Sequence, residues 1–283
     1  MQLIGYEPTR GQPFPPALSP PVALAYVKQL WVEGARDEAL ERVRAFVADP
    51  RMTQDPKLAA KAFIKCGQWQ QEYYTSGRAG AALAAPSGPP PAVGRGGSGG
   101  DWRDGPGTEP LDEAHTAAVL ESLRRASELD PKSYKAWHTW AMVNFEAVGS
   151  PTGDGSRYVV PAIAGFFRSI ALGRERALQD TLRLLTMWFK YGATPAVDEA
   201  VQRGFLAIPI DTWLLVTPQI IAHIHSSTTL VRRSVHTLLC RVAKAHPQGL
   251  VYPLTVASKS QSMPRQRAAQ RVLAEMRKQC DRL

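Results

Sequence analysis

Histidines are the residues of this chain with the widest chemical range, because an imidazole can carry a proton or bind a metal near neutral pH. His223 and His225 are two positions apart, which places them on different faces of a helix and excludes a shared metal ion there. We assign no local carboxylate or cysteine partner to the other histidines, which are His115, His138, His236 and His246. We therefore expect structural or surface histidines rather than a metal site.

A second candidate is the glycine-rich stretch Gly94-Arg95-Gly96-Gly97-Ser98-Gly99, which matches the pattern G-x-G-x-x-G. That pattern binds phosphate when a strand precedes it and a helix follows it, and neither is predicted here. We attribute the match to chance in a tract rich in glycine. The chain also lacks Walker A, HExxH, HRD and DFG sequences, so we expect no catalytic residues in it.

Composition limits the remaining classes of function. The 283 residues are 44% hydrophobic and 21% charged, which is enough to bury a sizeable core. The net charge of +9 is spread along the predicted helices, which favours a solvated surface over a nucleic-acid site. No stretch approaches the roughly 20 apolar residues of a membrane span, and residues 1–10 contain no long apolar run, so we expect no signal peptide there. Three distant cysteines without C-x-x-C spacing suit a reducing compartment better than disulfides or zinc, and they are Cys66, Cys240 and Cys280.

Apolar residues at helical spacing predict that nearly all of the chain is helical. Residues 1–76 are expected to form the N-terminal hairpins, one broken at Gly34 and the next at Gly67. Residues 77–110 are rich in glycine, proline, alanine and serine, which predicts a disordered insertion. Residues 111–283 continue as paired helices. We expect an all-α fold, an α-solenoid of tetratricopeptide (TPR)-like and HEAT-like hairpins.

The stretch from Asp130 to Ala141 has the pattern of the seam in a TPR-like helix pair, with Pro131 ending one helix and starting the next. More hydrophobic, HEAT-like helices are predicted over residues 159–172, 176–191, 195–207, 211–224, 228–245, 248–258 and 264–280. Tryptophans at helical spacing are expected in the core, and they are Trp31, Trp69, Trp137, Trp140, Trp188 and Trp213.

Basic side chains are the remaining binding candidates. Three successive hairpins contain Lys28, Arg36, Lys65 and Lys135, which stacking of the hairpins could bring together. Such a cluster would call for a polyphosphate, whereas separate positions would be ordinary solvated charges, and the spacing leaves both interpretations open. The C-terminal stretch is also basic, and either a solvated helix face or an acidic partner chain would explain Arg265, Arg267, Arg271, Arg277, Lys278 and Arg282.

Several uninterrupted stretches go beyond a generic repeat. They are residues 134–138 (YKAWH), 143–148 (VNFEAV), 165–170 (GFFRSI), 178–183 (LQDTLR), 210–214 (IDTWL) and 252–260 (YPLTVASKS). In sequence, order and separation they resemble the C-terminal part of the FAT domain of target-of-rapamycin (TOR) kinases, in the PI3K-related kinase family. The resemblance extends from about Leu3 to Leu283 without the glycine- and proline-rich insertion. The resemblance departs at one point. In the family a longer insertion follows the VNFEAV stretch, whereas here that gap is only Gly149 to Tyr158.

The resemblance implies a non-catalytic clamp around a serine/threonine protein kinase domain, with a role in TOR complex assembly and in nutrient and growth signalling. Implied partners are the rapamycin-binding and kinase domains of the same, longer parent chain and the TOR complex subunits. The implied location is the cytoplasm, with endomembrane or nuclear association through the parent complex. The alternative is a free-standing TPR-type adaptor that binds a protein partner.

No cofactor for catalysis is expected, but the resemblance implies one structural ligand. FAT domains of TOR-like kinases hold inositol hexakisphosphate in a basic pocket. The basic positions of that pocket match Lys28, Arg36, Lys65 and Lys135 of this chain.

Overall fold

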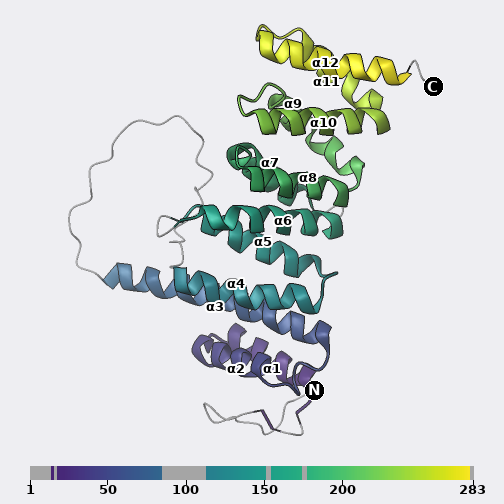
Figure 1. The fold of residues 1–283 in the computed structure, drawn as a ribbon. Coiled ribbons are helices and arrows are strands. Elements are labelled where there is room, and N and C mark those ends of the chain that lie inside the picture. Colours follow the sequence, from purple (N-terminus) through teal and green to yellow (C-terminus); the bar gives the residue numbers. More distant parts are fainter. Residues whose placement is uncertain (1–13, 16–17, 85–112, 151–153, 174–176, 281–283) are drawn as a thin grey trace. The chain divides into compact units, whose positions relative to one another are not determined.

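The computed structural model describes residues 14–15, 18–84, 113–150, 154–173 and 177–280, and every regular element in these ranges is a helix. The chain divides into two compact units. Unit 1 comprises Met1–Asp130 with Gly149–Gly153, and unit 2 comprises Pro131–Val148 with Asp154–Leu283. Within each unit, most helices pack on the helix before or after them in the chain, as α3 does on α4 and α5 on α6 (Figure 1). The predicted all-α solenoid of helical hairpins is confirmed.

Unit 1 contains the helices α1 (Pro20–Val32), α2 (Arg36–Ala48), α3 (Pro56–Ala84) and α4 (Glu113–Leu129). The turn between α1 and α2 needs Gly34, whose φ of 89° suits a residue without a Cβ. The predicted hairpin around Gly34 is therefore confirmed. Helix α2 packs on α3, and α3 packs on α4. The core of α1, α2 and α3 includes Leu24, Val43 and Phe46.

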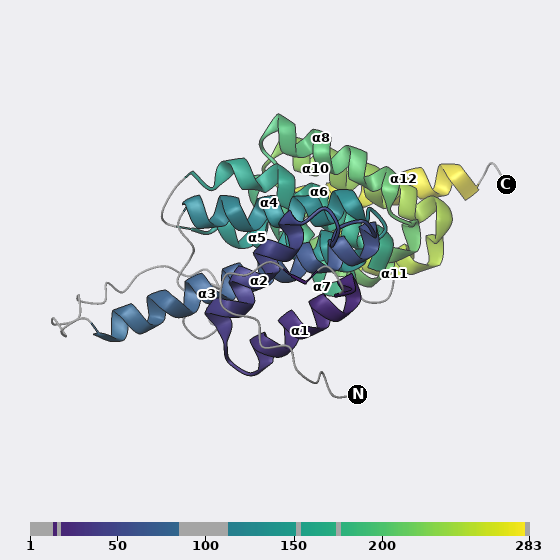
Figure 2. The same cartoon turned by 90° about the horizontal axis from the view of Figure 1, so that it is seen from below.

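The second predicted break, at Gly67, is wrong, because α3 is continuous from Pro56 to Ala84. Gly67 is buried, and a Cβ built on it would lie 2.8 Å from Cγ of Leu123 in α4. This glycine therefore allows two helices to approach rather than ending one. The helix also runs past the predicted boundary at residue 76, because alanine favours helix in this stretch. Figure 2 shows the C-terminal end of α3 extending beyond the other helices of unit 1.

Unit 2 contains α5 (Tyr134–Val148), α6 (Ser156–Gly173), α7 (Leu178–Tyr191), α8 (Pro195–Ala207), the 3-10 helix η2 (Ile210–Val216), α9 (Thr217–Ala222), α10 (Thr229–Ala245), α11 (Pro247–Ser258) and α12 (Met263–Cys280). Helix α6 packs on α5, α7 and α8, and α10 packs on α8, α11 and α12. One hydrophobic core runs through all of these helices. Proline at the first turn of α8 and of α11 marks their starts, as the sequence predicted.

The single helix predicted over residues 211–224 is wrong, because the chain forms η2 and then the short helix α9 there. Pro218 lies in the first turn of α9, and its missing N–H and fixed φ interrupt a continuous helix at that point. Trp213 and Val216 of η2 are nevertheless buried.

The tryptophans divide into two groups. Trp69, Trp188 and Trp213 are buried, which confirms the prediction for them. The other three are only half-buried, and they are Trp31, Trp137 and Trp140; of these, Trp31 still packs against the core of unit 1. The indole of Trp137 donates a hydrogen bond of 3.0 Å to the carbonyl oxygen of Pro131, which keeps one edge of the ring at the surface turn before α5.

Some predictions fall where the structure gives no test. The predicted seam from Asp130 to Ala141 crosses the border between the units, so the pairing of its two helices stays a prediction. Other predicted parts lie outside the described residues. They are residues 1–13, the remainder of the predicted insertion (residues 85–110, with the Gly94–Gly99 motif), and the side chains of Cys280 and Arg282.

Among the described helices, no single one has the length and hydropathy of a membrane span, and only the pair Pro195–Ala207 and Ile210–Ala222, bent by 115°, reaches them jointly.

Candidate functional site

The four basic residues predicted to share a site are divided between the units. Lys28 in α1 and Lys65 in α3 are half-buried, and Arg36 at the start of α2 is exposed, all in unit 1. Lys135 is exposed on α5 in unit 2. The pocket formed by all four residues therefore stays a prediction.

Two of these residues meet at one pair of tryptophans. The rings of Trp31 and Trp69 are stacked, with centroids 4.7 Å apart and an angle of 5° between their planes. The guanidinium carbon of Arg36 lies 5.5 Å from the centre of the Trp31 ring, and Nζ of Lys65 lies 5.8 Å from that of Trp69. Arg36 also forms an ion pair of 3.3 Å with Glu72. Cation–π contact and ion pairing thus hold both cations beside the tryptophan pair.

A buried carboxylate joins α5, α6 and α7 in unit 2. The side chain of Asp180 is 1% exposed, and it accepts a hydrogen bond of 2.7 Å from Oγ of Ser169. Its two oxygens lie 2.9 and 3.0 Å from Nδ1 of His138. Nη1 of Arg183 and the hydroxyl of Tyr134 lie 3.4 and 3.5 Å from it. These donors offset the several kcal/mol that a carboxylate loses on leaving water.

The network around Asp180 is not a nucleophilic relay. In a hydrolytic triad the serine gives its proton to the histidine, and the carboxylate holds the other imidazole nitrogen. Here Ser169 and His138 both bond to the carboxylate itself. Ser169 is also fully buried, so its hydroxyl has no access to a substrate. We assign the network a structural role, in which Asp180 fixes the spacing of three consecutive helices.

Two other histidines have partners that we did not predict. His246, which precedes α11, forms a hydrogen bond with Asp211 of η2. His236 lies 3.8 Å from the sulfur of Cys240, one turn later in α10. The expectation that no local carboxylate or cysteine partner exists is therefore wrong for His236, whereas the partners of His138 and His246 are 42 and 35 positions away.

The two thiols in the described part of the chain, Cys66 and Cys240, are not activated by their surroundings. Burial lowers the pKa of His236, with the charge of Arg271 as the second cause, and burial raises the pKa of the Cys240 thiol. Burial likewise raises the pKa of the Cys66 thiol in α3. Both shifts favour the neutral thiol over the nucleophilic thiolate. Within the described residues, no group of three or more histidine, cysteine and acidic side chains could hold a metal ion.

The helical array of both units is matched by two family models. The model of the FAT domain matches residues 1–186. The chain belongs to the FAT domain family. The second model describes HEAT repeats of serine/threonine-protein kinase ATR-like proteins, and it matches residues 196–283 of this FAT-domain chain.

This FAT-domain chain is similar to segments of TOR kinases. It is 35% identical over 316 residues to serine/threonine-protein kinase mTor of Drosophila melanogaster, an alignment covering 98% of this chain and 11% of the relative. Identity to serine/threonine-protein kinase TOR2 of Saccharomyces cerevisiae is 36% over 324 residues, an alignment covering 92% of this chain and 12% of the relative. Identity to serine/threonine-protein kinase TOR of Oryza sativa subsp. japonica is 47% over 178 residues, an alignment covering 59% of this chain and 7% of the relative. The chain therefore spans about a tenth of the length of these relatives.

The fold of this FAT-domain chain also resembles a solved structure. The structure described as the FAT and kinase domain of CtTel1 matches with a TM-score of 0.62 at 13% identity, covering 91% of this chain and 19% of that one. At this identity the likeness concerns the fold alone, and it agrees with the stacked hairpins. The resemblance to the FAT domain of TOR kinases is confirmed, and the matched region is the FAT domain rather than the kinase domain.

Proposed function

We propose that this FAT-domain chain is the non-catalytic scaffold of a TOR-type serine/threonine kinase, in which it clamps the kinase domain and supports assembly of TOR complexes in nutrient and growth signalling. The FAT match over residues 1–186, with relatives that are serine/threonine kinases, carries this proposal. The buried Asp180 network supports it, because a clamp must resist deformation. The partners are then the kinase and rapamycin-binding domains of the same chain, in the cytoplasm or at membranes that the parent complex visits.

A chimeric kinase tests this role. The chain replaces the matching segment of Saccharomyces cerevisiae TOR2, to which it is 36% identical, in cells that depend on the chimera. We expect growth and phosphotransfer by the chimera, and no phosphotransfer by the isolated chain, because the chain contains no phosphate-binding loop or catalytic aspartate motif.

The control for the chimera is TOR2 from which the same segment is deleted. If cells that depend on the shortened TOR2 grew as well as cells that depend on the chimera, the result would contradict a scaffold role. Kinase motifs encoded in the genomic DNA downstream of the Leu283 codon would support the proposal, and a stop codon there would favour the free-standing adaptor instead.

We propose in addition that Lys28, Arg36, Lys65 and Lys135 bind inositol hexakisphosphate. The meeting of Arg36 and Lys65 at the Trp31–Trp69 pair supports this site, since it holds two of the four cations in one region of unit 1. We expect the ligand, at roughly 100 times its Kd, to raise the melting temperature by about 5 °C. The variant Lys65→Ala with Lys135→Ala should lose that shift.

The matched control for this ligand is Lys61→Ala with Lys132→Ala, because both lysines are exposed and their removal lowers the charge equally. An equal loss of the shift in the two double variants would indicate diffuse attraction to a basic surface. An unchanged shift in Lys65→Ala with Lys135→Ala would place the ligand elsewhere.

A further inference from the structure

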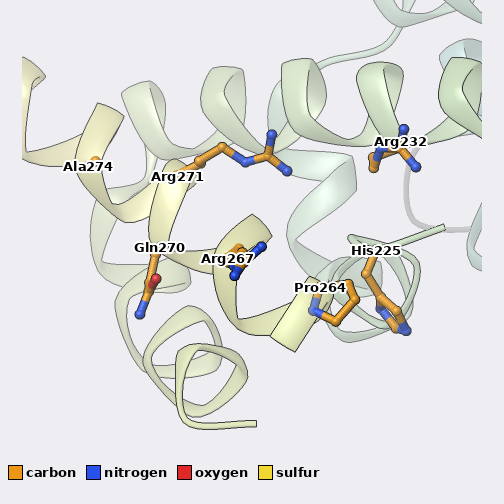
Figure 3. Close-up of a pocket in the computed structure, with 7 residues that line it drawn as sticks. All are labelled: His225, Arg232, Pro264, Arg267, Gln270, Arg271 and Ala274. Carbon is orange, nitrogen blue, oxygen red and sulfur yellow. The ribbon is translucent and has the colours of Figure 1, made fainter. Parts of the chain in front are cut away.

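A pocket of about 590 Å³ lies within unit 2, between the turn that follows α9, the first turn of α10 and one side of α12 (Figure 3). Its lining consists of His225, Arg232, Pro264, Arg267, Gln270, Arg271 and Ala274. Three of these side chains carry a guanidinium, and none of the lining residues is acidic. The pocket is therefore a cationic site formed mainly by two helices, α10 and α12, which are separated in the sequence by α11.

The arginine from α10 is held in place. Nη1 of Arg232 donates hydrogen bonds of 2.8 and 3.4 Å to the carbonyl oxygens of Ser226 and Ser227, and Nη2 lies 3.3 Å from Oγ1 of Thr229. These acceptors use part of the five-donor guanidinium and fix its plane. An arginine already held in one geometry loses less side-chain entropy when it binds a ligand.

The two arginines from α12 lack counterions within the described part of the chain. Arg267 and Arg271 are exposed and one helical turn apart, and they form neither an ion pair nor a hydrogen bond there. The next carboxylate along that face, Glu275, is bonded to Lys278 at 2.8 Å. Elsewhere on the surface, arginines such as Arg203 pair with a carboxylate one turn away. The pocket thus concentrates three guanidinium groups without an acidic side chain in its lining.

We propose that this pocket binds a phosphorylated serine or threonine side chain of a protein segment. A guanidinium matches a phosphate group with two parallel hydrogen bonds, and opposed arginines are the usual receptor for such a group. Apart from the arginines and His225, the lining is formed by the neutral residues Pro264, Gln270 and Ala274. A phosphopeptide suits this division, with its single dianion at the arginines and its neutral main chain along the other wall. A compact polyphosphate would need cations on all sides.

The size of the pocket agrees with this ligand. A volume of about 590 Å³ is within the range of ligand pockets and is much larger than one phosphate group requires. The additional space can hold the peptide residues on either side of the phosphorylated one. The amide of Gln270 can hydrogen-bond to their main chain, as it offers both a donor and an acceptor.

Binding of a short fluorescent peptide tests the proposal. The peptide has one phosphoserine flanked by alanines, and its affinity for the full 283-residue chain is measured at constant ionic strength. We expect the phosphorylated peptide to bind at least about tenfold more tightly than its serine counterpart. Arg267→Ala with Arg271→Ala should weaken binding of the phosphopeptide by about tenfold or more. The control Lys244→Ala with Arg277→Ala removes the same charge from exposed positions outside the pocket and should leave binding unchanged.

Four outcomes would overturn the proposal. Two concern affinity for the phosphopeptide in the variants: an equal loss in both double variants, or an unchanged affinity in Arg267→Ala with Arg271→Ala. The third is equal affinity of the chain for the phosphorylated and the unphosphorylated peptide. The fourth is binding of vesicles containing phosphatidylserine without binding of the phosphopeptide. Circular dichroism and the melting temperature of each variant establish that it is folded. Should Arg267→Ala with Arg271→Ala not fold, Arg271→Gln provides the same comparison with one charge removed.

Discussion

Replacing Asp180 by alanine is expected to lower the free energy of unfolding by about 3 kcal/mol, the lower end of the range for breaking a buried ionic network. The substitution removes the shorter of two hydrogen bonds that the buried Ser169 hydroxyl donates, and leaves the one of 3.0 Å to the carbonyl oxygen of Phe166. His138 and Arg183 are about one third exposed and can be partly resolvated, so the loss stays at the lower end. Urea unfolding followed by far-UV circular dichroism measures the change.

The matched control is Asp211→Ala, since Asp211 also bonds to a histidine but its side chain is 72% exposed. An exposed pair of this kind contributes at most about 1 kcal/mol. Amide hydrogen exchange should place the loss caused by Asp180→Ala in α5, α6 and α7, which the carboxylate joins. Equal effects of the two substitutions would show that burial of Asp180 does not matter and that the network is dispensable.

Helix ends were predictable where the cause is local. Gly34, with its positive φ, and the prolines at the first turns of α8 and α11 act through their own backbone. The helix ends at these positions can therefore be predicted from the residue type alone. Gly67 looks the same in sequence, yet its role depends on Leu123 in another helix. The effect of Pro218 was overlooked, although proline at this position predicts a break.

The sites were less predictable than the helices, because their residues meet only after the hairpins stack. His138 and Asp180 are 42 positions apart, and no local spacing relates them. The arginines of α12 were noticed as a basic stretch, but Arg232 on α10 completes the pocket with them. A polar residue at a helix position expected to be apolar, such as Asp180, is the signal in the sequence that could have indicated a buried network.

Gly204→Ala is the other substitution for which a large effect is expected, a loss of about 2–3 kcal/mol of unfolding free energy. A Cβ on Gly204 in α8 would penetrate the ring of Phe167 in α6. That ring is 3% exposed and is held by Phe205 and Trp213, with centroids 6.1 and 6.5 Å away. Overpacking costs about 1–3 kcal/mol, and a Phe167 ring held on both sides places this substitution at the upper end of that range. The higher helix propensity of alanine then offsets up to about 1 kcal/mol.

A double-mutant cycle separates this steric cause from a general weakness of α8. Phe167→Ala alone should cost about 3–5 kcal/mol, because it empties a large aromatic site. In that background the new methyl group of Gly204→Ala enters vacant space, so the double variant should be at least about 1 kcal/mol more stable than the two single losses predict by addition.

The matched control for Gly204→Ala is Gly249→Ala in α11. There the added Cβ would meet only the flexible end of Leu214, at 3.2 Å from its Cδ2. A change within about 0.5 kcal/mol is expected at this position. Strict additivity in the cycle, or an equal loss from Gly249→Ala, would mean that close contact of α8 with the Phe167 ring does not limit the stability of unit 2. Urea unfolding of all four variants on the same chain decides between these outcomes.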